Sequence, residues 1–324
     1  MSPVVGKRFA AAAILVVAFI AGCGGEESAS EGEGGNLSIA TGGTAGVYQV
    51  YGGGLADVIS DELDGYQATA ETTSASVDNI KLIAQQDSDV AFTLADTAID
   101  AVEGRESFDG PQPVRALAQI YTNYTQIGTT AGADISSVED LRGKRVSVGD
   151  PGSGTEVIAV RVLEAAGLDP DEDIDRSQLG VDESVNAVRD GSIDAFFWSG
   201  GLPTGAVTDL ATTDELVLVP NAEYVPKLRD QYGEAYHEAT IPADTYKGLD
   251  EDVPVIGVPN LLVVHEEMED DLAHDLTALL FDQKKRLTQV HPEAKNLDRQ
   301  DAQNVVPPVE LHPGAQRYFE EGGS

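Results

Sequence analysis

The stretch IATGGTAGVYQVYGGGLADVIS, residues 39–60, gives the strongest indication of the fold. A short apolar strand ends at Thr41, a glycine-rich turn follows, and Tyr51, Leu55 and Val58 then recur at helical spacing. Small residues at the start of a helix leave its first backbone N–H groups uncovered, and these groups together with the helix dipole attract anions. We therefore predict a strand–turn–helix unit whose turn contacts a small anionic ligand.

Two further junctions place small residues between a strand and a helix. They are ETTSASVDNIKLI at residues 71–83 and GDPGSGTEVIAVRVL at residues 149–163. Gly, Ser, Thr and Asp also favour ordinary turns and helix caps, so each junction alone has a purely structural explanation. Three such junctions in one chain point instead to a shared anion-binding cleft, with capping chemistry as the alternative.

Strand and helix patterns alternate along the rest of the chain. This alternation predicts an α/β fold with mainly parallel sheets. The clearest helix spans residues 268–287, and glycines 52–54, inside the first helix, are expected to pack against a neighbouring backbone. The expected strands are residues 37–41, 88–93, 114–121, 144–149, 194–199 and 255–265.

The first residues describe an export signal. Lys7 and Arg8 precede an apolar run from Phe9 to Ala21, and the sequence IAGC then ends at Cys23, the chain's one cysteine. The pattern resembles a bacterial lipoprotein signal, and the run is shorter than the roughly 20 residues that a transmembrane anchor needs. We expect a signal peptide at 1–22, a lipidated Cys23 and a flexible tether at 23–35. The mature protein is then extracytoplasmic and contacts the cell membrane through its lipid anchor only.

Composition and motifs exclude several classes of function. The chain of 324 residues has 20 Lys and Arg against 56 Asp and Glu, a net charge of −36, and this charge disfavours nucleic acid as a partner. GDPGSGTE lacks the lysine of a phosphate-binding loop. The five histidines are scattered, and we find neither a metal site nor a catalytic constellation nor a cofactor motif. We expect a protein that is not an enzyme.

Five ordered blocks of the sequence resemble the TAXI family of extracytoplasmic solute receptors, the binding subunits of TRAP transporters. The resemblance implies a type II periplasmic-binding-protein fold with two α/β lobes that close on a ligand. It also implies TRAP membrane subunits as partners and a small anionic solute such as glutamate, 2-oxoglutarate or a related dicarboxylate. The blocks are LSIATGGTAGVYQVYGGGLA, ETTSASVDNIKLIAQQDSDVAF, DLRGKRVSVGDPGSGTE, FFWSGGLPTGAVTDLA and VPVIGVPNLLVVHEEM.

Within this resemblance we place the first lobe at residues 36–122 and 256–324 and the second at 123–255. Two departures from the family pattern leave the ligand open: Ala75 stands where the family has glycine, and Leu202 where it has histidine. Arg115 or Arg161 could supply a local positive charge. The matching ligand-binding positions are Gly43, Thr44, Gly46, Tyr48, Ser74, Ser76, Asn79, Ser153, Gly154, Thr155, Trp198, Gly201 and Pro203.

Two other functions remain open on the sequence. An α/β enzyme could use the same junctions to bind a carboxylated or phosphorylated substrate, with an acid–base pair among the many carboxylates. A receptor for a membrane sensor would bind the same ligands without transport.

Overall fold

The computed structural model describes residues 34–44 and 46–322. The predicted signal peptide, Cys23 and most of the predicted tether lie outside the described residues. None of the helices within the described ranges is long and apolar enough to cross a membrane.

The first part of the described chain forms three parallel strands joined by helices. β1 pairs with β2 on one side and β3 on the other, as expected when each strand-to-strand connection contains a helix. The elements are β1 (Asn36–Ala40), α1 (Val47–Glu62), β2 (Gln67–Glu71), α2 (Ser76–Ala84), β3 (Val90–Leu94) and α3 (Ala95–Glu103).

Glycines inside α1 allow side chains of other elements to approach the helix. A Cβ added to Gly52 would lie 2.5 Å from Cγ2 of Thr41, and one added to Gly54 would lie 2.8 Å from the methyl groups of Val290. Gly53 faces open space. The close neighbours are therefore side chains, and the expectation of a neighbouring backbone was wrong.

A second set of strands and helices follows the long strand β4 (Val114–Thr130), and three of its strands, β5, β6 and β7, again pair in parallel. β5 lies between β6 and β7. After the short 3-10 turns η1 (Ala131–Ala133) and η2 (Glu139–Leu141), the elements are β5 (Arg145–Ser147), α4 (Gly154–Ala165), β6 (Asp175–Ser177), α5 (Val181–Asp190), β7 (Ala195–Gly200), α6 (Gly205–Thr213), β8 (Leu216–Leu218), η3 (Ala222–Tyr224), α7 (Val225–Tyr232) and β9 (His237–Ile241).

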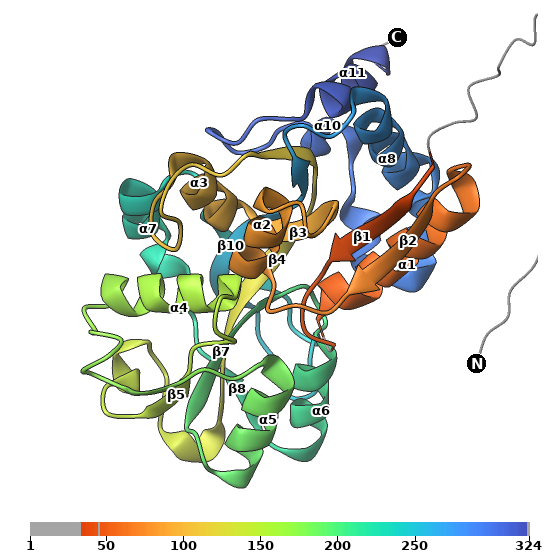
Figure 1. The fold of residues 1–324 in the computed structure, drawn as a ribbon. Helices are drawn as coiled ribbons and strands as arrows, with labels where there is room; N and C mark the ends of the chain where they lie inside the picture. Colours follow the sequence, from red (N-terminus) through yellow and green to blue (C-terminus); the bar gives the residue numbers. More distant parts are fainter. Residues whose placement is uncertain (1–33, 45, 323–324) are drawn as a thin grey trace, which may run out of the picture. The chain divides into compact units, whose positions relative to one another are not determined.

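Two long antiparallel strands, β4 (Val114–Thr130) and β10 (Val253–His265), join these two sets (Figure 1). The end of β10 pairs with β3, and its beginning pairs with β9. The end of β4 pairs with β7 and β8. One sheet results, with the order β2-β1-β3-β10-β4-β7-β5-β6. We call the part around β1 to β3 the first sheet half and the part around β5 to β7 the second.

The predicted helix 268–287 is two helices, α8 (Asp270–Asp282) and α9 (Lys284–Val290). Gln283, between the two helices, has φ −101° and ψ 12°, outside helical geometry. Beyond it, the side chain of Val290 in α9 lies close to Gly54 of α1. The chain then continues through η4 (Pro292–Asn296), α10 (Arg299–Ala302) and α11 (Pro313–Glu321).

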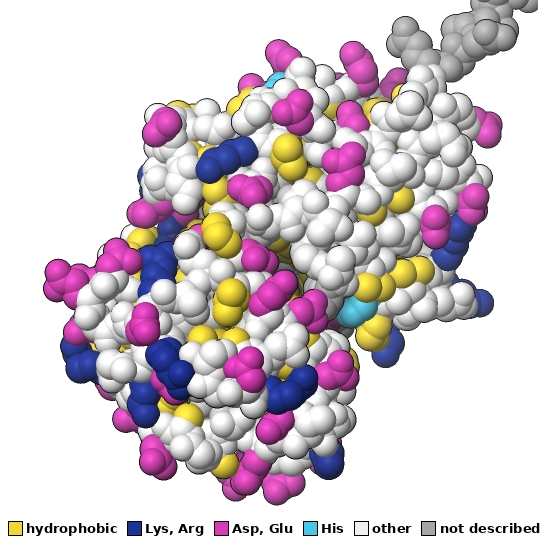
Figure 2. All heavy atoms as spheres, turned by 60° about the horizontal axis from the view of Figure 1, so that its bottom comes forward, with side chains coloured by type: hydrophobic (Ala, Val, Ile, Leu, Met, Phe, Trp, Pro, Cys, Tyr) yellow, Lys and Arg dark blue, Asp and Glu magenta, His cyan; other side chains and the backbone are white. Residues whose placement is uncertain are grey.

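Apolar side chains cover the sheet in three clusters. One packs α1, α8, α9 and α11 on the first half, a second packs α2, α3, α4 and α7, and a third packs α5 and α6 against β7. Acidic side chains are spread over the face shown in Figure 2 rather than gathered in one patch, as expected for a solvated acidic surface.

Candidate functional site

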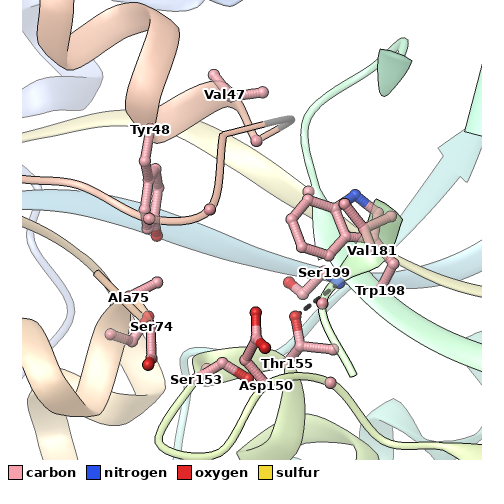
Figure 3. Close-up of a pocket in the computed structure, with 18 of the residues that line it drawn as sticks. Val47, Tyr48, Ser74, Ala75, Asp150, Ser153, Thr155, Val181, Trp198 and Ser199 are labelled. Carbon is pink, nitrogen blue, oxygen red and sulfur yellow. Dashed lines mark hydrogen bonds between the residues drawn. The ribbon is translucent and has the colours of Figure 1, made fainter. Parts of the chain in front are cut away.

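A cavity of about 320 Å³ lies where the two sheet halves meet (Figure 3). Tyr48, Ser74 and Ala75 line it from the first half, and Thr155 and Trp198 line it from the second. Both polar and apolar groups line the cavity, as is usual for small-molecule sites.

Four helices begin at the wall of this cavity. The residue before each helix lines it: Gly46 before α1, Ala75 before α2, Ser153 before α4 and Gly180 before α5. The first N–H groups of a helix have no partner within the helix, and its dipole makes that end positive. The cavity is therefore suited to an anionic group although no Lys, Arg or His is among its described lining residues.

The three junctions singled out from the sequence all contribute to the cavity. Of the thirteen predicted ligand-binding positions, ten line it: Gly43, Thr44, Gly46, Tyr48, Ser74, Ser76, Ser153, Gly154, Thr155 and Trp198.

The other three predicted positions lie outside the lining, and each has a structural role or an exposed place. The buried Asn79 donates to the carbonyl oxygens of Thr41 and Phe92 at 2.7 and 2.8 Å, which links the residue after β1 to the middle of β3. A Cβ on Gly201 would lie 2.8 Å from Glu293, so this glycine allows a close approach, and Pro203 is exposed. We leave these three residues out of the proposed site.

A chain of hydrogen bonds through buried amides at the wall of the cavity was not predicted from the sequence. The Tyr48 hydroxyl donates to Asn260 of β10, whose amide donates to Asn123 Oδ1 of β4 at 2.9 Å. Asn123 in turn donates to the Ser199 carbonyl of β7 at 3.0 Å. An asparagine inside each of two long apolar strands was the available signal, because buried polar groups require partners.

The two sheet halves also bond directly beside the cavity. The N–H groups of Val77 and Asp78 at the start of α2 donate to the Gly152 carbonyl at 3.2 and 3.3 Å. Across the cavity, a Cβ on Gly46 would lie 3.5 Å from the Trp198 ring. These contacts close the cavity from two sides.

Comparison with known proteins places the chain in a family. The model of the NMT1-like family matches residues 39–323. The chain belongs to the NMT1-like family.

Solved structures with a similar fold are solute-binding proteins. PhnD1 from Prochlorococcus marinus, in complex with methylphosphonate, is 11% identical over 88% of this NMT1-like chain and 96% of its own, with a TM-score of 0.55. A binding component of an ABC phosphonate transporter from Pseudomonas aeruginosa is 14% identical over 80% and 78% of the two chains, with a TM-score of 0.52. An ancestral arginine-binding protein bound to arginine is 16% identical over 80% and 97%, with a TM-score of 0.51. These likenesses confirm the predicted α/β fold of type II periplasmic binding proteins.

Charged groups in the cavity of this NMT1-like chain are all acidic. Asp150, Asp182 and Glu183 line it. Burial, followed by the charge of Glu183, raises the pKa of Asp150, and the same two causes with Asp209 raise the pKa of Asp182. The sequence reasoning did not single out these carboxylates, because the chain has too many acidic residues for any of them to stand out.

Neither arginine that was considered as a local cation lines the cavity. Arg115 pairs with Glu310 at 2.9 Å, and Arg161 is buried against Asp96 and Asp100. Over the described residues, no group of three or more His, Cys, Asp and Glu could hold a metal ion. The cavity of this NMT1-like chain therefore offers backbone N–H groups, hydroxyls and carboxylates, which can bind a ligand by hydrogen bonds and charge.

Proposed function

We propose that this chain is an extracytoplasmic solute receptor that captures a small carboxylate-bearing organic solute in the cavity between its two sheet halves. The observation that carries the proposal is the convergence of four helix N-termini on one cavity. The dipole of each helix favours negative charge at this end without a cationic side chain. The first N–H groups of α1 have no side-chain cap, whereas those of Val77 and Asp78 in α2 already donate to the Gly152 carbonyl. A carboxylate group, as in glutamate, 2-oxoglutarate and related dicarboxylates, fits these helix N-termini.

Capture by closure of two lobes is part of the proposal. The first lobe corresponds to residues 36–122 and 256–324 and the second to 123–255, with β4 and β10 as the connecting strands. The contact of α2 with Gly152 and that of Gly46 with Trp198 stabilise a closed form. A solute that contacts both lobes binds this form better and shifts the population toward it.

The partner and the anchor belong to the same proposal. The sequence resemblance to the TAXI family supports delivery of the solute to TRAP-type membrane subunits. The lipoprotein-like segment supports attachment through Cys23 to the cell membrane.

The chain's single tryptophan provides the test. Trp198 lines the cavity, so ligand binding and closure should change its fluorescence. The purified protein is titrated with L-glutamate, 2-oxoglutarate, succinate, inorganic phosphate and a sugar, and we expect saturable changes with a carboxylate only. A response to phosphates alone, or turnover of a carboxylate, would favour the alternative hypothesis that the protein is an enzyme.

A matched pair of serine variants tests the site itself. Ser74 lines the cavity and Ser137 does not, although both are half-buried. Loss of one hydrogen bond to a charged carboxylate costs about 1.5–3 kcal/mol. Ser74→Ala should therefore weaken binding about tenfold or more, and Ser137→Ala should leave it unchanged. Equal affinities of the two variants would place the solute elsewhere.

A further inference from the structure

One carboxylate points into the cavity and has no side-chain partner among the described residues. Asp150 lies between β5 and α4, where its backbone carbonyl accepts from the Ser153 N–H at 3.1 Å and so fixes the turn. Figure 3 shows its side chain directed into the space between Tyr48 and Thr155. No hydrogen bond or ion pair joins this carboxylate to any residue within the described ranges.

A second carboxylate approaches the same point from α5. A Cβ built on Gly180 would lie 2.9 Å from Oδ2 of Asp150 and 2.7 Å from Oε2 of Glu183. The two side chains therefore converge over Gly180, at one end of the cavity. Two like charges placed together disfavour each other's ionised form unless a cation lies between them.

None of the described residues that line the cavity supplies a compensating positive charge. The other charged groups in this lining are Asp182 and Glu183, on the first turn of α5. Burial and Glu183 both raise the pKa of Asp150. A partly buried carboxylate without a partner is unfavourable in the protein alone, and a ligand cation would relieve that cost.

An amine-free dicarboxylate suits this end of the cavity poorly. The helix N-termini can hold one carboxylate, but a second carboxylate near Asp150 would meet charge of its own sign. A ligand with an ammonium group next to its carboxylate matches both environments, because its cation can bind Asp150 while its anion contacts the helix starts.

We propose that Asp150, assisted by Glu183, binds an ammonium group, so that the solute is a zwitterionic amino acid and not an amine-free carboxylic acid. This inference rests on the proposed function of the same cavity. It assigns the choice between solutes to Asp150, a residue outside the set predicted from the sequence.

Matched pairs of ligands test the inference on the unaltered protein. L-Glutamate and glutarate differ only in the ammonium group, and so do L-alanine and propionate. Isothermal titration calorimetry on the purified protein should show at least tenfold tighter binding of the amine-bearing member of whichever pair binds. Equal affinities within that pair, or a preference for the amine-free acid, would overturn the inference and leave the proposed function standing. Absence of binding to every carboxylate would overturn both.

Variants then test Asp150 itself. Asp150→Asn should weaken binding of the amine-bearing ligand tenfold or more and leave that of the amine-free partner unchanged or improved. Asp250→Asn is the control. It removes the same charge, and Asp250 is exposed and lies outside the cavity lining. An Asp150→Asn protein that keeps its amine affinity would contradict the assignment. Should that variant fail to fold, the ligand pairs on the unaltered protein decide.

Discussion

Ala75 lies in a backbone region that suits glycine. Its φ is 77° and its ψ is −148°, and it immediately precedes α2 at the wall of the cavity. Side chains at such angles are strained by about 1–3 kcal/mol, and strain of this kind is common at ligand-binding sites. The sequence showed an unusual alanine at this position, but only the backbone angles explain why glycine would fit better.

Ala75→Gly should therefore raise the free energy of unfolding by about 1 kcal/mol. Relief of the strained φ outweighs the roughly 0.7 kcal/mol by which glycine's extra freedom favours the unfolded chain. Urea unfolding followed by circular dichroism measures the change. Ala166→Gly is the control, because Ala166 ends a helix at an ordinary φ of −79° and glycine there can only destabilise. A loss of stability in both variants would argue against strain at Ala75.

At the scale of elements, the contact between α2 and the turn before α4 depends on a glycine. Gly152 has a φ of 78°, and a Cβ there would lie 2.7 Å from Oδ1 of Asp78 on α2. Its carbonyl is also the acceptor for the first N–H groups of α2. This turn thus lets the two sheet halves approach beside the cavity.

Gly152→Ala should weaken solute binding about tenfold as well as destabilise the fold. The positive φ costs about 1–2 kcal/mol in any L-residue, and the clash with Asp78 acts in addition on the closed form. Gly143→Ala is the matched control, since Gly143 has a φ of 75° with open space around it. Calorimetric titration and thermal unfolding of both variants separate the two effects. An equal loss of affinity in both would show that the contact with α2 is irrelevant to binding.

The elements that were predictable from sequence are those whose own residues specify them. All six expected strands exist, because each is a run of apolar and β-branched residues that the core requires. Four strands were missed. β2 (QATAE), β6 (DRS) and β9 (HEATI) have few apolar side chains, and pairing with a neighbour defines them, while β8 (LVL) is apolar but only three residues long. For a similar reason, we did not predict that the start of α5 lines the cavity. Its sequence, GVDES, is ordinary helix-capping chemistry, and only the sheet order brings it beside the other three helix starts.

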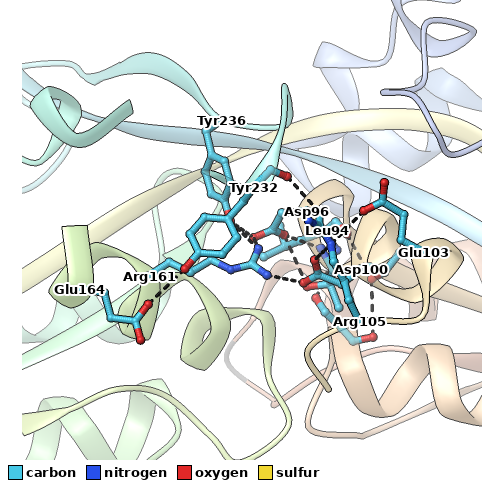
Figure 4. Close-up of polar contacts among 12 residues, drawn as sticks. Leu94, Asp96, Asp100, Glu103, Arg105, Arg161, Glu164, Tyr232 and Tyr236 are labelled. Atoms are coloured by element: carbon cyan, nitrogen blue, oxygen red, sulfur yellow. Dashed lines mark hydrogen bonds and ion pairs between the residues drawn. The ribbon is translucent and has the colours of Figure 1, made fainter. Parts of the chain in front are cut away.

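At the scale of the whole molecule, a buried ion cluster joins the two sheet halves (Figure 4). Arg161 of α4 pairs with Asp96 and Asp100 of α3 and donates to the Tyr236 hydroxyl at 2.8 Å. That hydroxyl donates in turn to Asp96 at 2.7 Å. No local pattern in the sequence relates residues so far apart, so the cluster could not be predicted.

Replacement of Arg161 should lower the free energy of unfolding, and the size of this loss should depend on pH. Arg161→Met leaves the buried Asp96 without its cation and Asp100 with Arg105 alone, which costs about 3–5 kcal/mol at neutral pH. Burial already raises the pKa of Asp100 to about 6 against the opposing effect of Arg161, and loss of Arg161 raises it further. The folded variant then binds more protons than the unfolded chain, so its stability falls as pH rises. The deficit relative to the unaltered protein should therefore be larger at pH 8 than at pH 5.

Urea unfolding at the two pH values measures this deficit, and an exposed ion pair provides the control. Arg142 pairs with Asp173 at the surface, where an ion pair contributes about 0–1 kcal/mol. Arg142→Met should therefore cost less than about 1 kcal/mol at both pH values. A deficit for Arg161→Met that is small, or that does not change with pH, would mean that the cluster is not what couples the two halves. A large deficit with the expected pH dependence would show that the ion pairs between α3 and α4 stabilise the folded chain by joining its two sheet halves.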